Sequence, residues 1–240
     1  MILANSLVEG FLGSNFMGQA IVLLQLAGSV VMVAAAIGKW RELDSYARAT
    51  RRFLRDFSTA GDVMDYYFKR RPDAAIGIER IYKDACDRLM RLLSPEVRTL
   101  LVGRRTDGNG DAALNKREIA LIDSTCEHAL DEEEIRIERG MGVIATVVAL
   151  APMLGLLGTV WGVLDAFADM GTAGSANLAT IAPSISAALV TTVVGLLVAI
   201  PGVIVFNREN ATIREISSQL EGFADELKGR IACEFQGRGE

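Results

Sequence analysis

Two apolar stretches, APMLGLLGTVWGVLDAF at 151–167 and IAPSISAALVTTVVGLLVAIPGVIVFN at 181–207, decide the fold of this chain. Across residues 140–207 the only ionisable side chains are Asp165 and Asp169. A helix needs about 20 mostly apolar residues to cross a bilayer, and each stretch is long enough to do so. Both stretches nevertheless carry prolines, glycines and threonines, so their sequence must serve more than contact with lipid.

The composition indicates a membrane protein with large aqueous parts. The chain has 240 residues, half of them hydrophobic, and a mean hydropathy of +0.29. Charged residues are abundant at 39–139 and 207–240 and nearly absent elsewhere, a block pattern that a single soluble core does not produce. The net charge of −5, without a basic aromatic surface, argues against nucleic acid as a partner.

The sequence contains no set of residues typical of an enzyme or a metal centre. The three cysteines are widely separated and form no CxxC pair, which favours idle thiols in a reducing compartment. No nucleophile–base set, phosphate-binding loop or metal-ligand cluster is apparent. We therefore expect neither an enzyme nor a cofactor or metal site.

Residues 16–38 form another uncharged stretch, whose length as a helix is about 35 Å. Gln25 lies within it and is expected to face other helices, because polar groups in hydrocarbon need hydrogen-bond partners. Lysine and arginine cluster after residue 38, before residue 140 and after residue 207, and are absent from residues 1–15 and 169–177. Basic residues mark the cytoplasmic side of a membrane, so the N-terminus is predicted outside and the C-terminus inside.

The prediction is an all-α integral membrane protein in which three transmembrane helices extend into a helical cytoplasmic region. The predicted parts are a periplasmic N-terminal segment at 1–15, transmembrane helices at 16–38, 140–168 and 178–206, a cytoplasmic helical region at 39–139, a periplasmic turn at 169–177, and a cytoplasmic C-terminal helix and tail at 207–240.

Apolar periodicity predicts the helices of the polar parts. The first membrane helix should continue to about Ser58, and further helices should cover 62–70, 76 to about 94, and 114–139. The last of these should run directly into the second membrane span. The tail should be an amphipathic helix that either folds back on residues 39–139 or lines a vestibule of an oligomer.

Residues 107–118 match part of a calcium-loop pattern, with Asp107, Asp111 and Glu118 among the candidate ligands. Ala112 stands where the sharp turn of that loop requires glycine. A Gly- and Asp-rich loop that caps the next helix explains the same residues, so both interpretations remain open.

One face of each of the two opening stretches carries small residues at helical spacing. Close helix packing accounts for them, and the residues predicted to pack are Pro152, Gly155, Gly158, Gly162, Ala188, Gly195 and Pro201. The alternative is a narrow polar ion path lined by Thr159 and Thr192, with Ser184 and Thr191 on the same face. Neither face has an acid at mid-membrane depth, so a titrating carboxyl group would have to come from another chain.

The segments GLLGTVWG at 155–162 and ALVTTVVGLLVAIP at 188–201 resemble the TolQ/ExbB branch of the MotA/TolQ/ExbB proton-channel family. The resemblance is strong across 140–210 and weak across 39–139. It implies a multi-pass bacterial inner-membrane subunit that forms a homo-oligomer, a pentamer, around a dimer of a single-span ExbD/TolR-like partner. The partner's membrane helix carries the essential Asp, and a TonB- or TolA-like protein is a further possible partner.

The same resemblance assigns roles to residues of the pathway. Thr159 and Thr192 match threonines that face the partner's helix, and Ala187 stands where many relatives have a glutamate. The Thr191–Thr192 pair also resembles sodium-type stators, so the transported ion is open between proton and sodium.

The resemblance implies an ion-conducting, stator-like subunit of a motor that uses the ion-motive force to energise outer-membrane transport or envelope maintenance. One alternative is a flagellar or gliding-type stator subunit, although flagellar chains generally have four spans. Another is a membrane scaffold that conducts no ions, in which the small-residue faces serve packing alone.

Overall fold

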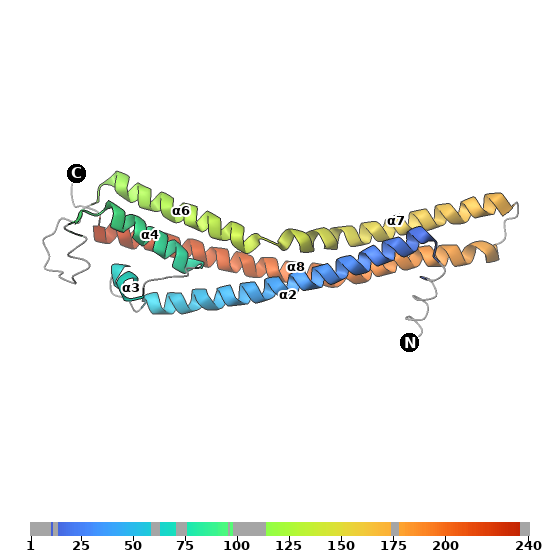
Figure 1. Cartoon of the computed structure of the whole chain (residues 1–240), viewed down its shortest axis with the longest axis horizontal. Helices are drawn as coiled ribbons and strands as arrows, with labels where there is room; N and C mark the ends of the chain where they lie inside the picture. The colour runs from blue at the N-terminus through green and yellow to red at the C-terminus, as the bar shows by residue number, and fades with distance from the viewer. Residues whose placement is uncertain are drawn as a thin grey trace. The chain divides into compact units, whose positions relative to one another are not determined.

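The computed structural model describes residues 11, 14–58, 63–70, 76–95, 97, 114–173 and 178–235. Nearly all of them lie in six α-helices, and the described residues contain no β-strand. Figure 1 shows the helices α2 (Phe16–Ser58), α3 (Val63–Arg70), α4 (Ile78–Leu92), α6 (Lys116–Glu138), α7 (Met141–Ala173) and α8 (Leu178–Phe235). The predicted all-α fold class is confirmed.

The chain divides into two compact units. The membrane unit comprises residues 1–40 and 140–210, and the polar unit comprises residues 41–139 and 211–240. Helices α2 and α8 each contribute one part to the membrane unit and the other part to the polar unit; the divisions fall after Trp40 and after Asn210. The predicted continuation of the first apolar helix to Ser58 is therefore confirmed.

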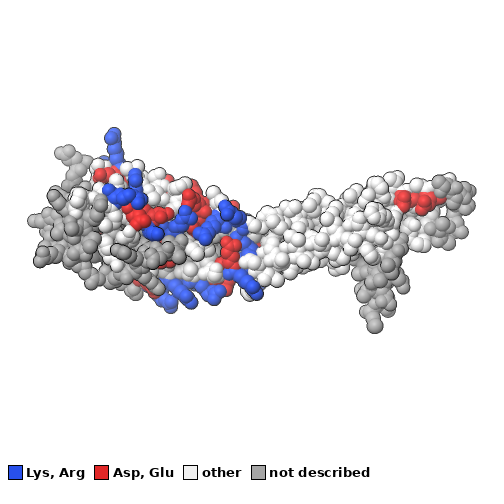
Figure 2. Space-filling model, viewed as in Figure 1, with Lys and Arg blue, Asp and Glu red and all other residues white. Residues whose placement is uncertain are grey.

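The membrane unit presents an apolar surface. Among the described residues, helices within 16–58, 116–171 and 181–235 are long and apolar enough to cross a membrane. Figure 2 shows charged side chains over the polar unit, whereas the described surface of the membrane unit is almost free of them. Large exposed side chains include Leu23, Leu24, Val30, Val31, Leu156, Leu164, Leu197, Ile200 and Ile204. An apolar surface of this kind is stable in a bilayer and marks the chain as a membrane protein.

The second membrane helix does not begin as an unbroken continuation of the preceding one. Helix α6 ends at Glu138, and α7 starts at Met141. Gly140 lies between them with a φ of 93°, in the left-handed region that residues with a Cβ rarely adopt. A glycine after the last helical turn is a common helix stop, and here it separates two helices that apolar periodicity joined.

The polar unit has an aromatic core. The ring of Phe53 on α2 lies 5.1 Å from that of Tyr66, 5.6 Å from that of Tyr82 and 5.3 Å from that of Phe223 on α8. The tail residues at helical spacing are all buried; they are Ile213, Ile216, Leu220, Phe223, Leu227 and Ile231. The tail therefore packs on its own chain, the first of the two predicted alternatives.

The start of α6 is fixed by a capping box. The side chain of Asn115 accepts a hydrogen bond from the backbone of Glu118 at 2.9 Å, and Glu118 accepts one from the backbone of Asn115 at 2.8 Å. These two residues are the end of the candidate calcium loop, and the cap accounts for both. The earlier part of that loop, including Asp107, Asp111 and Ala112, lies outside the described residues.

Candidate functional site

Helices α7 and α8 touch at their backbones, because glycines of α7 face α8. A Cβ on Gly155 would lie 2.8 Å from the Cα of Thr192, and one on Gly162 would lie 2.6 Å from the Cβ of Ala188. A Cβ on Gly158 would collide with the side chain of Thr191. Real Cβ atoms do not come this close to backbone, so only glycine permits the approach. The contact brings together two of the predicted signature segments.

Glycines of α8 also take part in the close contact between α7 and α8, which we call the crossing. A Cβ on Gly195 would lie 2.5 Å from the backbone oxygen of Ala151 and 2.8 Å from Nε2 of Gln25. A Cβ on Gly202 would lie 2.7 Å from the side chains of both Met32 and Val148. Gly202 is thus also part of the helix packing, as its spacing from Gly195 and Ala199 on the small-residue face predicts.

From Ala151 onward, the buried residues of α7 are Ala151, Gly155, Gly158, Gly162 and Ala166. The predicted packing residue Pro152 is half-buried beside this face, and Pro201 of α8 is exposed on the single chain. Surface that is exposed on one copy remains available to other chains in the membrane.

The three threonines differ in their hydrogen bonds. The Thr192 hydroxyl donates across to the backbone oxygen of Gly155 at 2.8 Å. The Thr191 hydroxyl lies 3.0 Å from the same oxygen and 2.7 Å from the backbone oxygen of Ala188. The Thr159 hydroxyl donates within its own helix, to Leu156 at 2.7 Å. A hydroxyl has one proton and two lone pairs, so each threonine can still accept a hydrogen bond.

The predicted pathway residues also differ in exposure. Thr191 and Ala187 are 1 % and 2 % exposed, so both are enclosed within the single chain. Thr159, Thr192 and Ser184 are half-buried, with part of each side chain open to the surroundings. Of the five, only these half-buried residues can touch another chain without a rearrangement of α7 and α8.

Gln25 of α2 reaches the same crossing. Its side chain is 2 % exposed, and its Nε2 donates to the backbone oxygens of Ala151 at 3.0 Å and of Thr191 at 3.2 Å. The prediction that Gln25 faces other helices is therefore confirmed. One amide group thus joins all the long helices of the membrane unit at the depth of Thr191, where hydrocarbon offers no other partner.

Among the residues that the structure describes, no carboxyl group stands at this depth. Asp165 of α7 is half-buried and accepts a hydrogen bond from the side-chain amide of Asn15, while Asp169 is exposed nearer the helix end. Among the described residues, no group of three or more histidine, cysteine or acidic side chains could hold a metal ion. The crossing offers hydroxyls and backbone oxygens, which can solvate an ion or bind a carboxylic acid but cannot release a proton at physiological pH.

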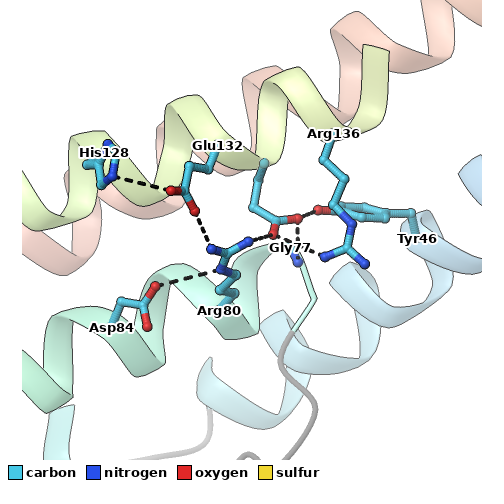
Figure 3. A network of polar contacts seen from close by, with 8 residues as sticks. Tyr46, Gly77, Arg80, Asp84, His128, Glu132 and Arg136 are labelled. Atoms are coloured by element: carbon cyan, nitrogen blue, oxygen red, sulfur yellow. Dashed lines mark hydrogen bonds and ion pairs between the residues drawn. The ribbon is translucent and has the colours of Figure 1, made fainter. Parts of the chain in front are cut away.

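A separate polar network lies in the polar unit (Figure 3). Glu133 of α6 is fully buried and accepts hydrogen bonds from the Tyr46 hydroxyl, from the Gly77 backbone at 3.0 Å and from Arg80 at 3.1 Å. Arg136 adds an ion pair at 3.5 Å. A buried carboxylate needs such compensation, and here its partners come from α2, from α6 and from the start of α4.

Sequence reasoning missed Glu133, although a signal was present. Its position continues the buried stripe of α6, formed by Ile122, Cys126, Ala129 and Ile137. An acid at a core position of an amphipathic helix predicts a buried ion pair. Tyr46 and Arg80 had no comparable signal, because their meeting with Glu133 depends on the tertiary fold.

Comparison with known proteins gives consistent matches over most of the chain. The chain is 30% identical over 224 residues to the Tol-Pal system protein TolQ of Pseudomonas aeruginosa, covering 89% of this chain and 90% of the relative. It is 27% identical over 219 residues to TolQ of Haemophilus influenzae, covering 90% of each chain. It is 28% identical over 201 residues to the biopolymer transport protein ExbB of Xanthomonas campestris pv. campestris, covering 83% of this chain and 77% of the relative.

The model of the MotA/TolQ/ExbB proton channel family matches residues 92–222. This range contains the contact of Gly155 with Thr192 and the whole of α7. The match covers more than half of the 240 residues. The chain therefore belongs to the MotA/TolQ/ExbB proton channel family.

Proposed function

We propose that this chain is the ion-conducting, stator-like subunit of an inner-membrane motor, with the proton as the ion. It acts with a single-span partner of the ExbD/TolR type, whose membrane helix supplies an aspartate. The observation that carries the proposal is the crossing of α7 and α8, where Thr192 is half-buried and the family's glutamate position holds the enclosed Ala187. Hydroxyls are present and a titrating group is absent, so the carboxyl group must come from another chain.

The proposed mechanism uses the hydroxyls to accommodate both charge states of the partner's aspartate. The lone pairs of Thr159 and Thr192 can accept a hydrogen bond from the protonated acid. When that acid loses its proton, a threonine that leaves its backbone acceptor can donate to the carboxylate. The glycine-lined contact keeps α7 and α8 together during this exchange, while their outer faces let the partner's helices turn or shift.

The proposed assembly is a homo-oligomer, a pentamer, around a dimer of the partner. The large apolar surface of the membrane unit leaves room for such contacts within the bilayer. The N-terminus is proposed to lie in the periplasm and the polar unit in the cytoplasm, because basic residues concentrate in the polar unit. Its relatives are named for the Tol-Pal system and for biopolymer transport, so the proposed work is envelope maintenance or outer-membrane transport, through a TolA- or TonB-like protein.

The energetics set a requirement on such a motor. One proton that crosses 100 mV releases about 2.3 kcal/mol, so a step against a substantial load consumes several protons. Cooperation of several copies of this chain around one partner would meet that requirement.

The test is proton flux into liposomes that contain this chain together with a single-span protein of the ExbD/TolR type that carries an aspartate in its span. The expected result is flux that requires both proteins and that is lost when the partner's aspartate is changed to asparagine. A potassium gradient with valinomycin sets the voltage, and a trapped pH dye reports the flux.

The control is the same complex with Thr192→Val in this chain, isolated with unchanged stoichiometry. Flux that equals the leak of liposomes holding this chain alone, from a stable wild-type complex, would establish the scaffold alternative. Sodium-dependent flux without acidification would instead assign sodium as the ion.

A further inference from the structure

Two opposite charges are buried together at one end of the membrane unit. Lys39 of α2 is 5 % exposed and Glu209 of α8 is 4 % exposed. Both belong to the membrane unit, directly beyond the apolar parts of their helices. Charged side chains are rarely enclosed to this degree unless they are paired or functional.

Glu209 is incompletely satisfied in this position. Its Oε2 is buried and has no hydrogen-bond partner among the described residues. A buried carboxylate oxygen without a donor is costly, and binding of a proton removes most of that cost by neutralising the charge. The Oε2 atom of Glu209 is therefore suited to bind a proton.

The charges that face Glu209 are few. Lys39 from α2 is the positive charge that acts on it, and Arg208 is its neighbour on α8 itself. Helix α7 has no ionisable side chain from Met141 to Leu164, so it brings no charge to this end of the unit. Burial raises the pKa of Glu209, and the nearby Lys39 ammonium only partly offsets this effect.

Glu209 is also distinct among the acids of the membrane unit. Within the described residues of that unit, the other carboxyl groups are Asp165 and Asp169, which are half-buried and exposed. Both follow Thr159 towards the C-terminal end of α7. Glu209 lies about 25 Å along α8 from Thr192, at the opposite end of the membrane unit. It is thus the enclosed acid on the side that carries the basic residues.

We propose that Glu209, enclosed at the same end of the membrane unit as Lys39, is a proton-binding group at the cytoplasmic end of the ion pathway. This inference rests on the proposed function. On uptake, a proton from water in the pathway forms an O–H bond with the carboxylate, and Glu209 becomes a neutral acid. On release, that bond breaks and the proton passes to cytoplasmic water.

The first test needs only this chain, in lipid nanodiscs, with its glutamate carboxyl carbons labelled with ¹³C. The resonance that disappears in Glu209→Gln is expected to titrate well above the ordinary glutamate value of about 4.3. Lys39→Met should move this titration upward by about one pH unit, because an opposite charge stabilises the carboxylate, whereas Lys39→Arg should not. A titration in the ordinary range, or one that Lys39→Met leaves unchanged, would overturn the proposal.

The second test measures flux through the complex with its single-span partner. Glu209→Gln is expected to remove most of the flux and to flatten its dependence on the pH of the cytoplasmic side, while Glu209→Asp restores both in part. Glu215→Gln, which changes an exposed acid on the same helix, is the matched control and should leave flux unchanged.

The two tests separate the two proposals. Wild-type flux and an unchanged pH profile in Glu209→Gln would show that Glu209 takes no part in proton transfer. A wild-type complex that does not conduct would refute the proposed function, whereas the titration in nanodiscs would still decide whether Glu209 binds a proton in the physiological range.

Discussion

The hydroxyl of Thr192 on α8 donates a hydrogen bond of 2.8 Å to the backbone oxygen of Gly155 on α7. The Thr191 hydroxyl is 3.0 Å from the same oxygen, so adjacent threonines converge on one carbonyl group. Gly155 has no Cβ, so no side chain of its own keeps the two threonines away from this carbonyl group. The polar character of the crossing is therefore held by backbone and hydroxyl groups of two helices, and it changes if either helix turns.

Two replacements of Thr192 distinguish the contribution of its hydroxyl from that of its side-chain shape. Thr192→Val keeps the branched side chain and should lower proton flux strongly, because no lone pair remains to bind the partner's acid. Thr192→Ser keeps the hydroxyl and should retain most of the flux. The lost hydrogen bond should change the stability of the complex by only about 1 kcal/mol, measured as its melting temperature in detergent. Equal flux from the valine and serine variants would contradict a role for the hydroxyl.

Enlargement of Gly155 should push α7 and α8 apart. A Cβ at this position would lie 2.8 Å from the Cα of Thr192 and 2.9 Å from the backbone oxygen of Thr191. Overpacking of this kind typically costs about 1–3 kcal/mol, so Gly155→Ala should lower the melting temperature and reduce assembly on size-exclusion chromatography.

The matched control is Gly142→Ala on the same helix, where an added Cβ meets nothing within 4 Å. This variant should behave as wild type or be slightly more stable, because alanine favours helix over glycine by about 1 kcal/mol. If both variants lost assembly equally, the glycine contact would not explain the effect.

Neutralisation of Glu133 should destabilise the polar unit. Glu133→Gln removes the buried negative charge and places an amide NH2 among the donors of Tyr46, Gly77 and Arg80, and a buried donor left without an acceptor typically costs about 1–3 kcal/mol. Glu132→Gln changes the neighbouring acid, which also pairs with Arg80 but is 41% exposed, and should cost far less. Circular dichroism melting of both variants checks the difference, and equal losses would refute the special role of the buried acid.

The three cysteines should differ in reactivity towards thiol reagents. Burial raises the pKa of the Cys126 thiol to about 12 and raises that of Cys86 as well, and both side chains are enclosed. Because the thiolate is the reactive form, these two should react only on unfolding, whereas the exposed Cys233 should react at once at pH 8. A maleimide mass shift of one label per native chain checks this, and Cys233→Ser should abolish the rapid label.

Much of the fold follows from local patterns in the sequence. Long uncharged stretches predict the membrane helices, and the stripe from Ile213 to Ile231 predicts the buried face of the tail. The break at Gly140 was not predicted, although a glycine after a charged last turn is a common helix stop, because the apolar stripe reaches Ile137 and apolar residues resume at Met141.

The candidate site was predictable in part. The spacing of Gly155, Gly158 and Gly162 indicates a face that packs closely, and the structure places this face against α8. The partial exposure of Thr192 and the enclosure of Thr191 were not predictable, because adjacent residues on one helix differ by about 100° in direction and the orientation depends on its neighbours. Lys39 and Glu209 are far apart in sequence, so their common burial requires the tertiary structure.

The interruption at Gly140 makes the long helices unequal in the continuity of their backbones. Helix α2 has no proline between Phe16 and Ser58, so its ladder of backbone hydrogen bonds is continuous, whereas α8 contains Pro183 and Pro201, each of which lacks the N–H of one helical hydrogen bond. The glycine interrupts the ladder between α6 and α7, so it can take up rotation there. Of the three membrane helices, α2 therefore has the most continuous backbone.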